Sequence, residues 1–337
     1  MEVFYPAFYN DFSCIAAACP DSCCKEWDVD VDAASAARYR ALPGPLGDRL
    51  RQVLRDTEGS TVMTIENGRC PMWQQDGLCR IQRELGHDAL CQVCQQFPRL
   101  RHDYGSFAEL GLELSCPEAA RLILTAPWEP FLIRQEPGGE TPDYDGEAMD
   151  ILLQSRSVAL ELLGDPAYSV PEALILLYFQ AHHAQTLLDG GEAPSFVPEE
   201  LLALARKHAK PGSLDAIVNI YRELEILTPQ WQQRLDAPRS PALWTDSHRN
   251  LARYFTERYW LQAVSDYDLL CRAKFILISC LLIRGLGGSL LQTAQLYSKE
   301  IENSSENMDA LLDSAYCHPA LTDDRLWGLL LGQEDTL

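Results

Sequence analysis

The chain has 337 residues, 47% of them hydrophobic and 23% charged, which is the balance of a folded globular protein rather than a disordered one. Its net charge of −21, with no concentrated basic patch to offset it, excludes nucleic acid as an expected partner, because an acidic chain repels phosphates. The longest apolar run, residues 275–283, is less than half as long as a membrane span, so we expect a core helix and no membrane span.

The first residues, MEVFYPAFYNDFS, carry no basic start and no long apolar stretch, so a secretory signal is not expected. Without an export signal the chain is expected in the cytoplasm, where disulfides are rare and clustered cysteines are more often metal ligands or catalytic groups. The acidic surface has two interpretations: it keeps the protein in solution, or it attracts a lysine-rich partner or substrate.

The cysteines are distributed unevenly, since nine of the twelve lie at or before Cys116. This asymmetry predicts a cysteine-rich metal- or iron–sulfur-binding module at 1–125, an acidic Pro/Gly-rich linker at 126–149, and a helical domain at 150–337. The expected fold class is mainly α, with a few short strands in the N-terminal module and a helical bundle in the C-terminal part.

Within the module, alternating apolar and polar residues predict a short strand at 26–32, and Asp32 is the expected N-cap of the helix that follows it and stops at Pro43. The remaining predicted elements are a helix at 44–56, a strand or hairpin with an Asn-Gly turn at 60–73, a helical stretch at 79–97 broken near Gly86, and a strand that turns into a helix at 106–124, with Ser115 as its possible cap.

Beyond the linker the helical period dominates, with apolar residues recurring at i, i+3, i+4 and i+7. Seven helices are predicted, at residues 148–164, 170–189, 198–209, 213–227, 248–264, 269–286 and 290–302. The glycine-dense stretch RGLGGSL (284–290) follows a helix rather than a strand, so we interpret it as a helix end and turn, not as a nucleotide-binding loop.

The spacing of the cysteines favours a metal site made of sulfur. Cys91-x2-Cys94 can chelate one ion from a single turn, and so can Cys19 and Cys23, whereas the adjacent Cys23 and Cys24 point in different directions. Thiolates select zinc, copper(I) or iron–sulfur clusters, and the irregular spacing leaves that choice open. The candidate ligands are Cys19, Cys23, Cys24, Cys70, Cys79, Cys91, Cys94 and Cys116.

The other metal-binding residue types have simpler interpretations. His87 and His102, the histidines of the module, are expected to be ordinary surface residues. Cys271 and Cys280 lie on the apolar helix and are expected in the core.

Four stretches of the module, FSCIAAACPDSCCKEWDVDVD, GRCPMW, GLCRIQRELGHDALCQVCQQFPR and LELSCPEAARLIL, together resemble the flagellin lysine-N-methylase family. They also resemble, more distantly, a wider cysteine-rich group of zinc- or iron-chelating proteins. The Cys91-x2-Cys94 pair and the segment around Cys116 point to the methylase branch. The resemblance covers about residues 5 to 125, and the helical remainder matches only in length and character.

The resemblance implies a protein-lysine N-methyltransferase that moves methyl groups from S-adenosylmethionine to lysine side chains of flagellin. It also implies an iron–sulfur cluster, expected to be [4Fe-4S], with zinc as the alternative. The radical signature Cys-x3-Cys-x2-Cys is not met, because Glu26 stands where the third cysteine belongs. A neutral lysine amine is already a nucleophile toward a methyl sulfonium, so direct displacement is expected.

Aromatic and carboxylate groups are the expected surroundings of a lysine amine. Residues 254–260, YFTERYW, and 142–147, PDYDGE, offer such groups, although core aromatics and a solvated acidic loop are the preferred explanation for them. The rival to the enzyme is a non-enzymatic metal-binding or redox-sensing module with a helical partner-binding domain, which the lack of a recognisable cofactor loop favours.

Overall fold

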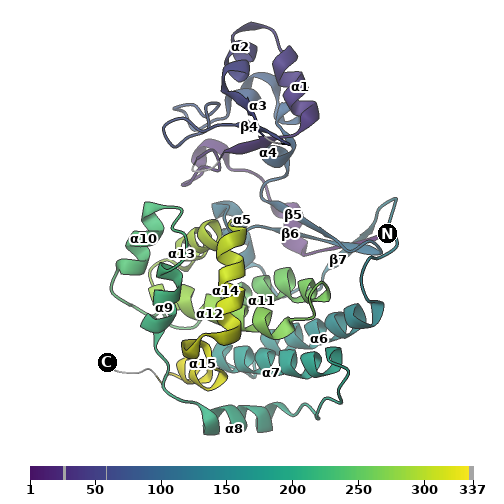
Figure 1. Cartoon of the computed structure of the whole chain (residues 1–337), viewed down its shortest axis with the longest axis vertical. Coiled ribbons are helices and arrows are strands. Elements are labelled where there is room, and N and C mark those ends of the chain that lie inside the picture. The colour runs from purple at the N-terminus through teal and green to yellow at the C-terminus, as the bar shows by residue number, and fades with distance from the viewer. Residues whose placement is uncertain (26–27, 58, 334–337) are drawn as a thin grey trace.

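The computed structural model describes residues 1–25, 28–57 and 59–333, and it is mainly α-helical, as the sequence predicts. Helices account for 58% of it, and it contains fifteen α-helices and a few short strands within these described residues. Figure 1 shows a small lobe, which we define as residues 13–98, joined to a larger helical lobe by a narrow sheet.

The small lobe has its own hydrophobic core, which includes Val31, Tyr39, Leu50 and Met72. Its elements are β2 (Val29–Val31), α1 (Ala33–Ala41), α2 (Gly44–Val53), β3 (Leu54–Asp56), β4 (Thr61–Met63), α3 (Arg80–Leu85), η3 (His87–Ala89) and α4 (Gln92–Gln96). The three strands form an antiparallel sheet in the order β2-β4-β3.

Several local sequence signals in this lobe predicted the observed structure. Asp32 caps α1 by accepting the Ser35 N–H at 2.9 Å, and the Asn67-Gly68 pair forms the expected tight turn with both residues at positive φ. The helical stretch breaks at Gly86, as expected. The helix predicted at 44–56 is too long, because residues 54–56 leave it to pair as β3 with β4. The strand expected at 26–32 is seen at Val29–Val31, and residues 26–27 lie outside the described residues.

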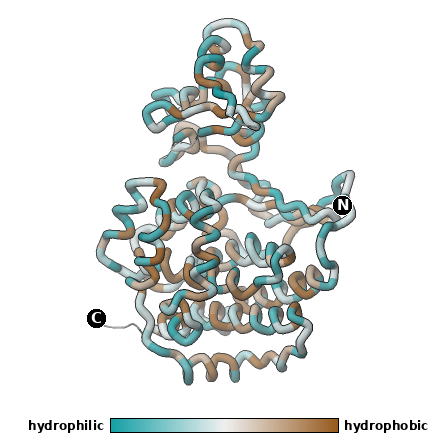
Figure 2. The backbone as a smooth tube through the Cα atoms, viewed as in Figure 1, coloured by the Kyte–Doolittle hydropathy of each residue, from teal (hydrophilic) through white to brown (hydrophobic). Residues whose placement is uncertain are grey.

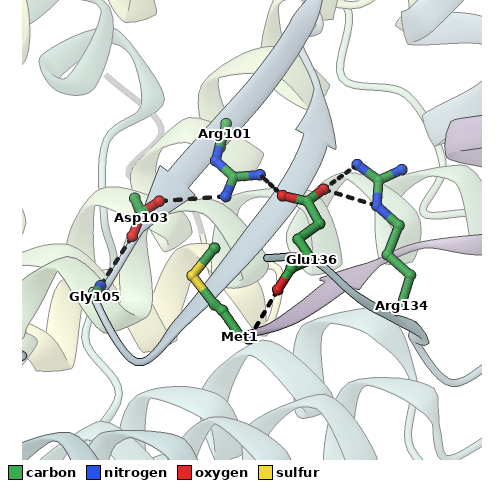
Figure 3. A network of polar contacts seen from close by, with 6 residues as sticks. All are labelled: Met1, Arg101, Asp103, Gly105, Arg134 and Glu136. Atoms are coloured by element: carbon green, nitrogen blue, oxygen red, sulfur yellow. Dashed lines mark hydrogen bonds and ion pairs between the residues drawn. The ribbon is translucent and has the colours of Figure 1, made fainter. Parts of the chain in front are cut away.

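The joining sheet has four strands in the order β5-β6-β1-β7: β1 (Glu2–Tyr5), β5 (Arg99–Asp103), β6 (Phe107–Leu112) and β7 (Leu132–Gln135). β1 runs parallel to β6 and antiparallel to β7. Figure 3 shows the contacts that hold its edge: Glu136 is paired with Arg101 at 3.1 Å and with Arg134 at 2.6 Å, and its carbonyl accepts from the Met1 amine at 3.0 Å. The stretch expected to be a linker therefore contributes a strand.

The large lobe consists of helices around one extensive core. They are α5 (Pro117–Thr125), α6 (Gly146–Gly164), α7 (Val170–Leu188), α8 (Pro198–His208), α9 (Leu214–Arg222), α10 (Pro229–Asp236), α11 (Asp246–Tyr259), α12 (Leu269–Leu286), α13 (Leu290–Tyr297), α14 (Ser305–Cys317) and α15 (Asp323–Leu330). A 3-10 turn, η4 (Trp260–Val264), extends α11, and a π-helical turn, η5 (Ser298–Glu302), extends α13. Figure 2 shows brown apolar positions recurring along these helices.

All seven predicted helices are present, while the sequence analysis missed α10, α14 and α15. The domain boundaries at 125 and 149 stay a prediction. The buried clusters group the chain in a further way, because Leu112, Leu114 and Cys116 pack into the core of the large lobe together with α5.

Candidate functional site

The Cys91–Cys94 pair is fixed in place by α1. Asp32 accepts the N–H of Gln92 at 2.9 Å with its second carboxylate oxygen, so one side chain caps both α1 and α4. The buried Tyr39 donates its hydroxyl to the carbonyl of Ala89 at 2.8 Å. These bonds hold the turn before α4, and with it the two thiols.

The two thiols of this pair are hydrogen-bonded to each other. This bond, against the effect of burial, lowers the pKa of Cys91 to about 7, and it raises the pKa of Cys94 together with burial. A thiol whose pKa is about 7 is half ionised at neutral pH, and thiolate is the form that binds metals.

Three cysteines stand at the N-cap positions of helices: Cys79 before α3, Cys91 before α4 and Cys116 before α5. Burial raises the pKa of Cys79, while the N–H groups of Ile81 and Gln82 act in the opposite direction. Burial likewise raises the pKa of Cys116 to about 11 against its own helix N–H groups. The Ser115 cap expected from the sequence is wrong: Cys116 holds that position, and the Ser115 hydroxyl donates to Glu113 instead.

The charges of the N-terminal cysteine thiols influence one another's pKa. The pKa of Cys94 is raised by the charges of Cys91, Cys24 and Cys70, after its bond to Cys91 and burial. Similar mutual effects link Cys79 to Cys23 and Cys91, and Cys116 to Cys19 and Cys23. Charge effects of this kind connect the eight candidate ligands, and Cys14 acts on Cys19 in the same way; the eight are Cys19, Cys23, Cys24, Cys70, Cys79, Cys91, Cys94 and Cys116.

All of these cysteines are free thiols, and none is in a disulfide. Within residues 1–25, 28–57 and 59–333, no group of three or more His, Cys, Asp or Glu side chains is arranged so that it could hold a metal ion. The donor chemistry nevertheless fits a thiolate-bound metal or cluster, because the neighbouring sulfur atoms disfavour one another's ionisation until a cation offsets their charge.

The cysteine region touches the large lobe through Asp21. Its carboxylate accepts hydrogen bonds from Lys25, from Gln295 at 2.8 Å and from the buried Lys299 at 2.6 Å. Gln295 also donates to the carbonyl of Ser115, beside Cys116. Lys299 belongs to the π-helical turn η5, and such turns occur frequently at functional sites.

A cavity lies where the joining sheet meets the large lobe, between β5, β6 and α11. Its charged lining includes Glu109, which forms a buried bidentate pair with Arg156 of α6. It also includes Glu257, which accepts from Arg253 at 2.6 Å, and Arg258, which lies 3.3 Å from the buried Glu302 of η5. Charges this deep in a protein are costly unless paired, so their presence marks a site with a purpose beyond packing.

The aromatic segment 254–260 is split between this cavity and the core. Tyr254 and Glu257 line the cavity, and the hydroxyls of Tyr254 and Tyr259 both donate to Glu302, at 2.9 and 2.7 Å. Phe255 and Trp260 are fully buried core residues. In the other segment, Asp145 caps α6 and Tyr144 contacts Ser106, which are structural roles.

The sequence analysis placed His102 at the surface, and that interpretation is wrong. His102 pairs across strands with Glu109, lines the cavity, and has a buried Nε2 atom. Burial, followed by the charge of Arg258, lowers its pKa, so the ring is neutral at pH 7. Alternation with the inward Leu100 could have placed it on the inner face of β5. His87, by contrast, is exposed, as expected.

Other expectations concern the helices of the large lobe. Cys271 and Cys280 are buried on α12, and Gly287 ends that helix at a φ of 68°, which is the expected helix terminus. Among the described residues no helix is both long and apolar enough to cross a membrane.

Fold and site together define a mainly helical protein that has a group of free cysteines and a cavity lined by buried charges. The chain is 34% identical over 137 residues to the flagellar biosynthetic protein FliU of Salmonella muenchen, a match that covers 38% of this chain and 79% of that protein. It is 35% identical over 134 residues to the lysine-N-methylases of Salmonella choleraesuis and Salmonella typhimurium, which covers 38% of this chain but only 33% of each of those proteins. The chain belongs to this family of FliU and lysine-N-methylase.

The chain thus matches about a third of the length of the lysine-N-methylases. No family profile matches the chain, and no solved structure does.

Proposed function

We propose that the protein is a cytoplasmic protein-lysine N-methyltransferase that transfers methyl groups from S-adenosylmethionine to lysine side chains of flagellin. The observation that carries this proposal is the family membership, since relatives that share about a third of their residues with the matched stretch are named for lysine methylation and for flagellar biosynthesis. The cavity lined by buried charges supports an enzyme over a purely structural module.

For the reaction we propose direct displacement. S-adenosylmethionine supplies an electrophilic methyl group when it is bound, so the protein must align the lysine amine, remove its proton and exclude water. S-adenosylhomocysteine is then the stoichiometric coproduct. Finding 5′-deoxyadenosine in its place would reject this part of the proposal.

For the cysteine cluster we propose a [4Fe-4S] cluster, with zinc as the alternative. The residues that would hold it are drawn from the eight clustered thiols, with Cys91 and Cys94 the first members. The absorption spectrum of anaerobically purified protein separates the two metals. A broad band near ~400 nm, where thiolate–iron charge transfer absorbs, indicates the cluster, whereas a colourless zinc-loaded protein excludes it.

The function itself is tested by mass spectrometry of flagellin that is co-expressed with and without this chain. We expect lysine-containing peptides to gain the mass of one or more methyl groups only when the chain is present. Unchanged lysine masses with the wild-type chain would reject the methyltransferase.

A further inference from the structure

The cavity between β5, β6 and α11 is small, with a volume of about 40 Å³. This is room for a small number of water-sized groups, which matches the end of a side chain.

Two of its lining side chains present polar atoms that have no hydrogen-bond partner among the described residues. One is Oδ1 of Asn250, a residue that is only 6% exposed. Its Nδ2 donates to the carbonyls of Leu124 and Ala126, at 3.1 and 2.9 Å, which fixes the amide so that Oδ1 is its free edge. The other is Nε2 of His102. A buried acceptor without a hydrogen bond costs free energy, so a donor bound in the cavity would stabilise both atoms.

The charges around the cavity also favour the binding of a cation. We define the charged cluster as three guanidinium groups and four carboxyl groups: Arg156, Arg253, Arg258, Glu109, Glu113, Glu257 and Glu302. If all are ionised the cluster has one negative charge in excess. Burial raises the pKa of both Glu113 and Glu257 against the effect of the nearby arginines, so a further cation beside them would favour their ionised form.

We propose that this cavity binds the ε-ammonium group of the target lysine. Its three N–H donors match Oδ1 of Asn250, Nε2 of His102 in the tautomer that carries its proton on Nδ1, and the Glu257 carboxylate, which also accepts from Arg253 through Oε1. The ring of Tyr254 adds a face suited to a cation, and the apolar lining, which includes Phe8, Leu110 and Phe131, suits the methylene stem.

This inference rests on the proposed function for the identity of the ligand, but binding can be tested without turnover. The probe is n-butylammonium, which reproduces the end of a lysine side chain, and its control is 1-butanol. The ring C–H signals of His102, assigned with a His102→Gln variant, report on the cavity in NMR titrations. We expect a saturable shift with butylammonium and none with butanol. No shift, or equal shifts with both, would overturn the inference.

A charge variant sharpens the test. Glu257→Gln keeps the side-chain shape and the acceptor for Arg253 but removes the excess charge, so it should weaken butylammonium binding by at least about tenfold. The matched control is Glu161→Gln, which removes the same charge from the exposed face of α6 and should leave binding unchanged. Equal effects of the two variants would contradict a local site.

The two proposals fail in different ways. If butylammonium binds at His102 but flagellin remains unmethylated, the amine site stands and the methyltransferase does not. If flagellin is methylated while butylammonium leaves His102 untouched, the lysine binds elsewhere. In an active enzyme Glu257→Gln should raise the KM for flagellin, whereas loss of activity at unchanged KM would contradict a binding role.

Discussion

The buried pair between Glu109 and Arg156 gives a quantitative test of the structure. Both side chains are 8% exposed, they are joined by two hydrogen bonds, and Arg156 also donates to the carbonyl of Glu257 at 3.3 Å. Removing one partner of such a pair leaves a buried charge unpaired and typically lowers the free energy of unfolding by about 3–5 kcal/mol. Arg156→Met should cost the most, because Glu109 then has no cation bound to it, whereas Glu109→Met leaves Arg156 its carbonyl partner.

Replacing both residues removes the stranded charge. The Glu109→Met, Arg156→Met double variant should therefore cost at least about 2 kcal/mol less than the sum of the single variants. The measurement is the free energy of unfolding by urea, followed by circular dichroism. The exposed pair Arg40–Asp56 is the control, and its removal should cost much less than either single variant at the buried pair. Additive single costs at the buried pair would refute the assignment of this pair as a desolvated unit.

Three further predictions follow from other parts of the structure. Burial, and after it a nearby arginine, lowers the pKa of His248 to about 4, so between pH 6.5 and 4 the unfolded chain binds a proton that the folded chain lacks. The free energy of unfolding should therefore fall by about 3 kcal/mol as the pH falls through this window. The His248→Gln variant should lose that part of the pH dependence, measured by urea titration. Gly328→Ala should destabilise by about 3 kcal/mol, because the new Cβ would lie 1.8 Å from the carbonyl oxygen of Lys210, whereas Gly146→Ala, with no atom within 4 Å, should be neutral or slightly stabilising in the same assay. Cys94→Ala should lose metal and soluble protein together, measured by elemental analysis of the purified protein, and unchanged metal content would count against its role as a ligand.

The sequence predicted those features whose signals are local. Helices with a regular apolar period, the Asp32 cap and the Asn67-Gly68 turn appear where expected, because each depends on residues close in the chain. The strand β1 was missed, since Glu2–Tyr5 becomes a strand only by pairing with β6 and β7, more than a hundred residues away. Pairing at such a distance leaves no local pattern.

The candidate site was predictable in part for the same reason. The cysteine spacing indicated which thiols could belong together; that set stays a prediction, although charge effects connect these thiols in the structure. The charged cavity gave no such signal, because Glu109, Arg156 and Arg258 come from three separate elements and each resembles an ordinary surface charge in the sequence. The position of His102 at the cavity could be inferred only once the direction of β5 was known.

The cysteine region and the cavity are connected by two segments of the chain. One segment runs from Glu109 on β6 to Cys116 at the start of α5. The other is η5, in which Lys299 contacts Asp21 of the cysteine region while Glu302 accepts from the hydroxyl of Tyr254 at the cavity. These two segments therefore connect the cysteine region to the cavity through contacts that the structure shows, and the direct displacement proposed above assigns the metal no part in methyl transfer.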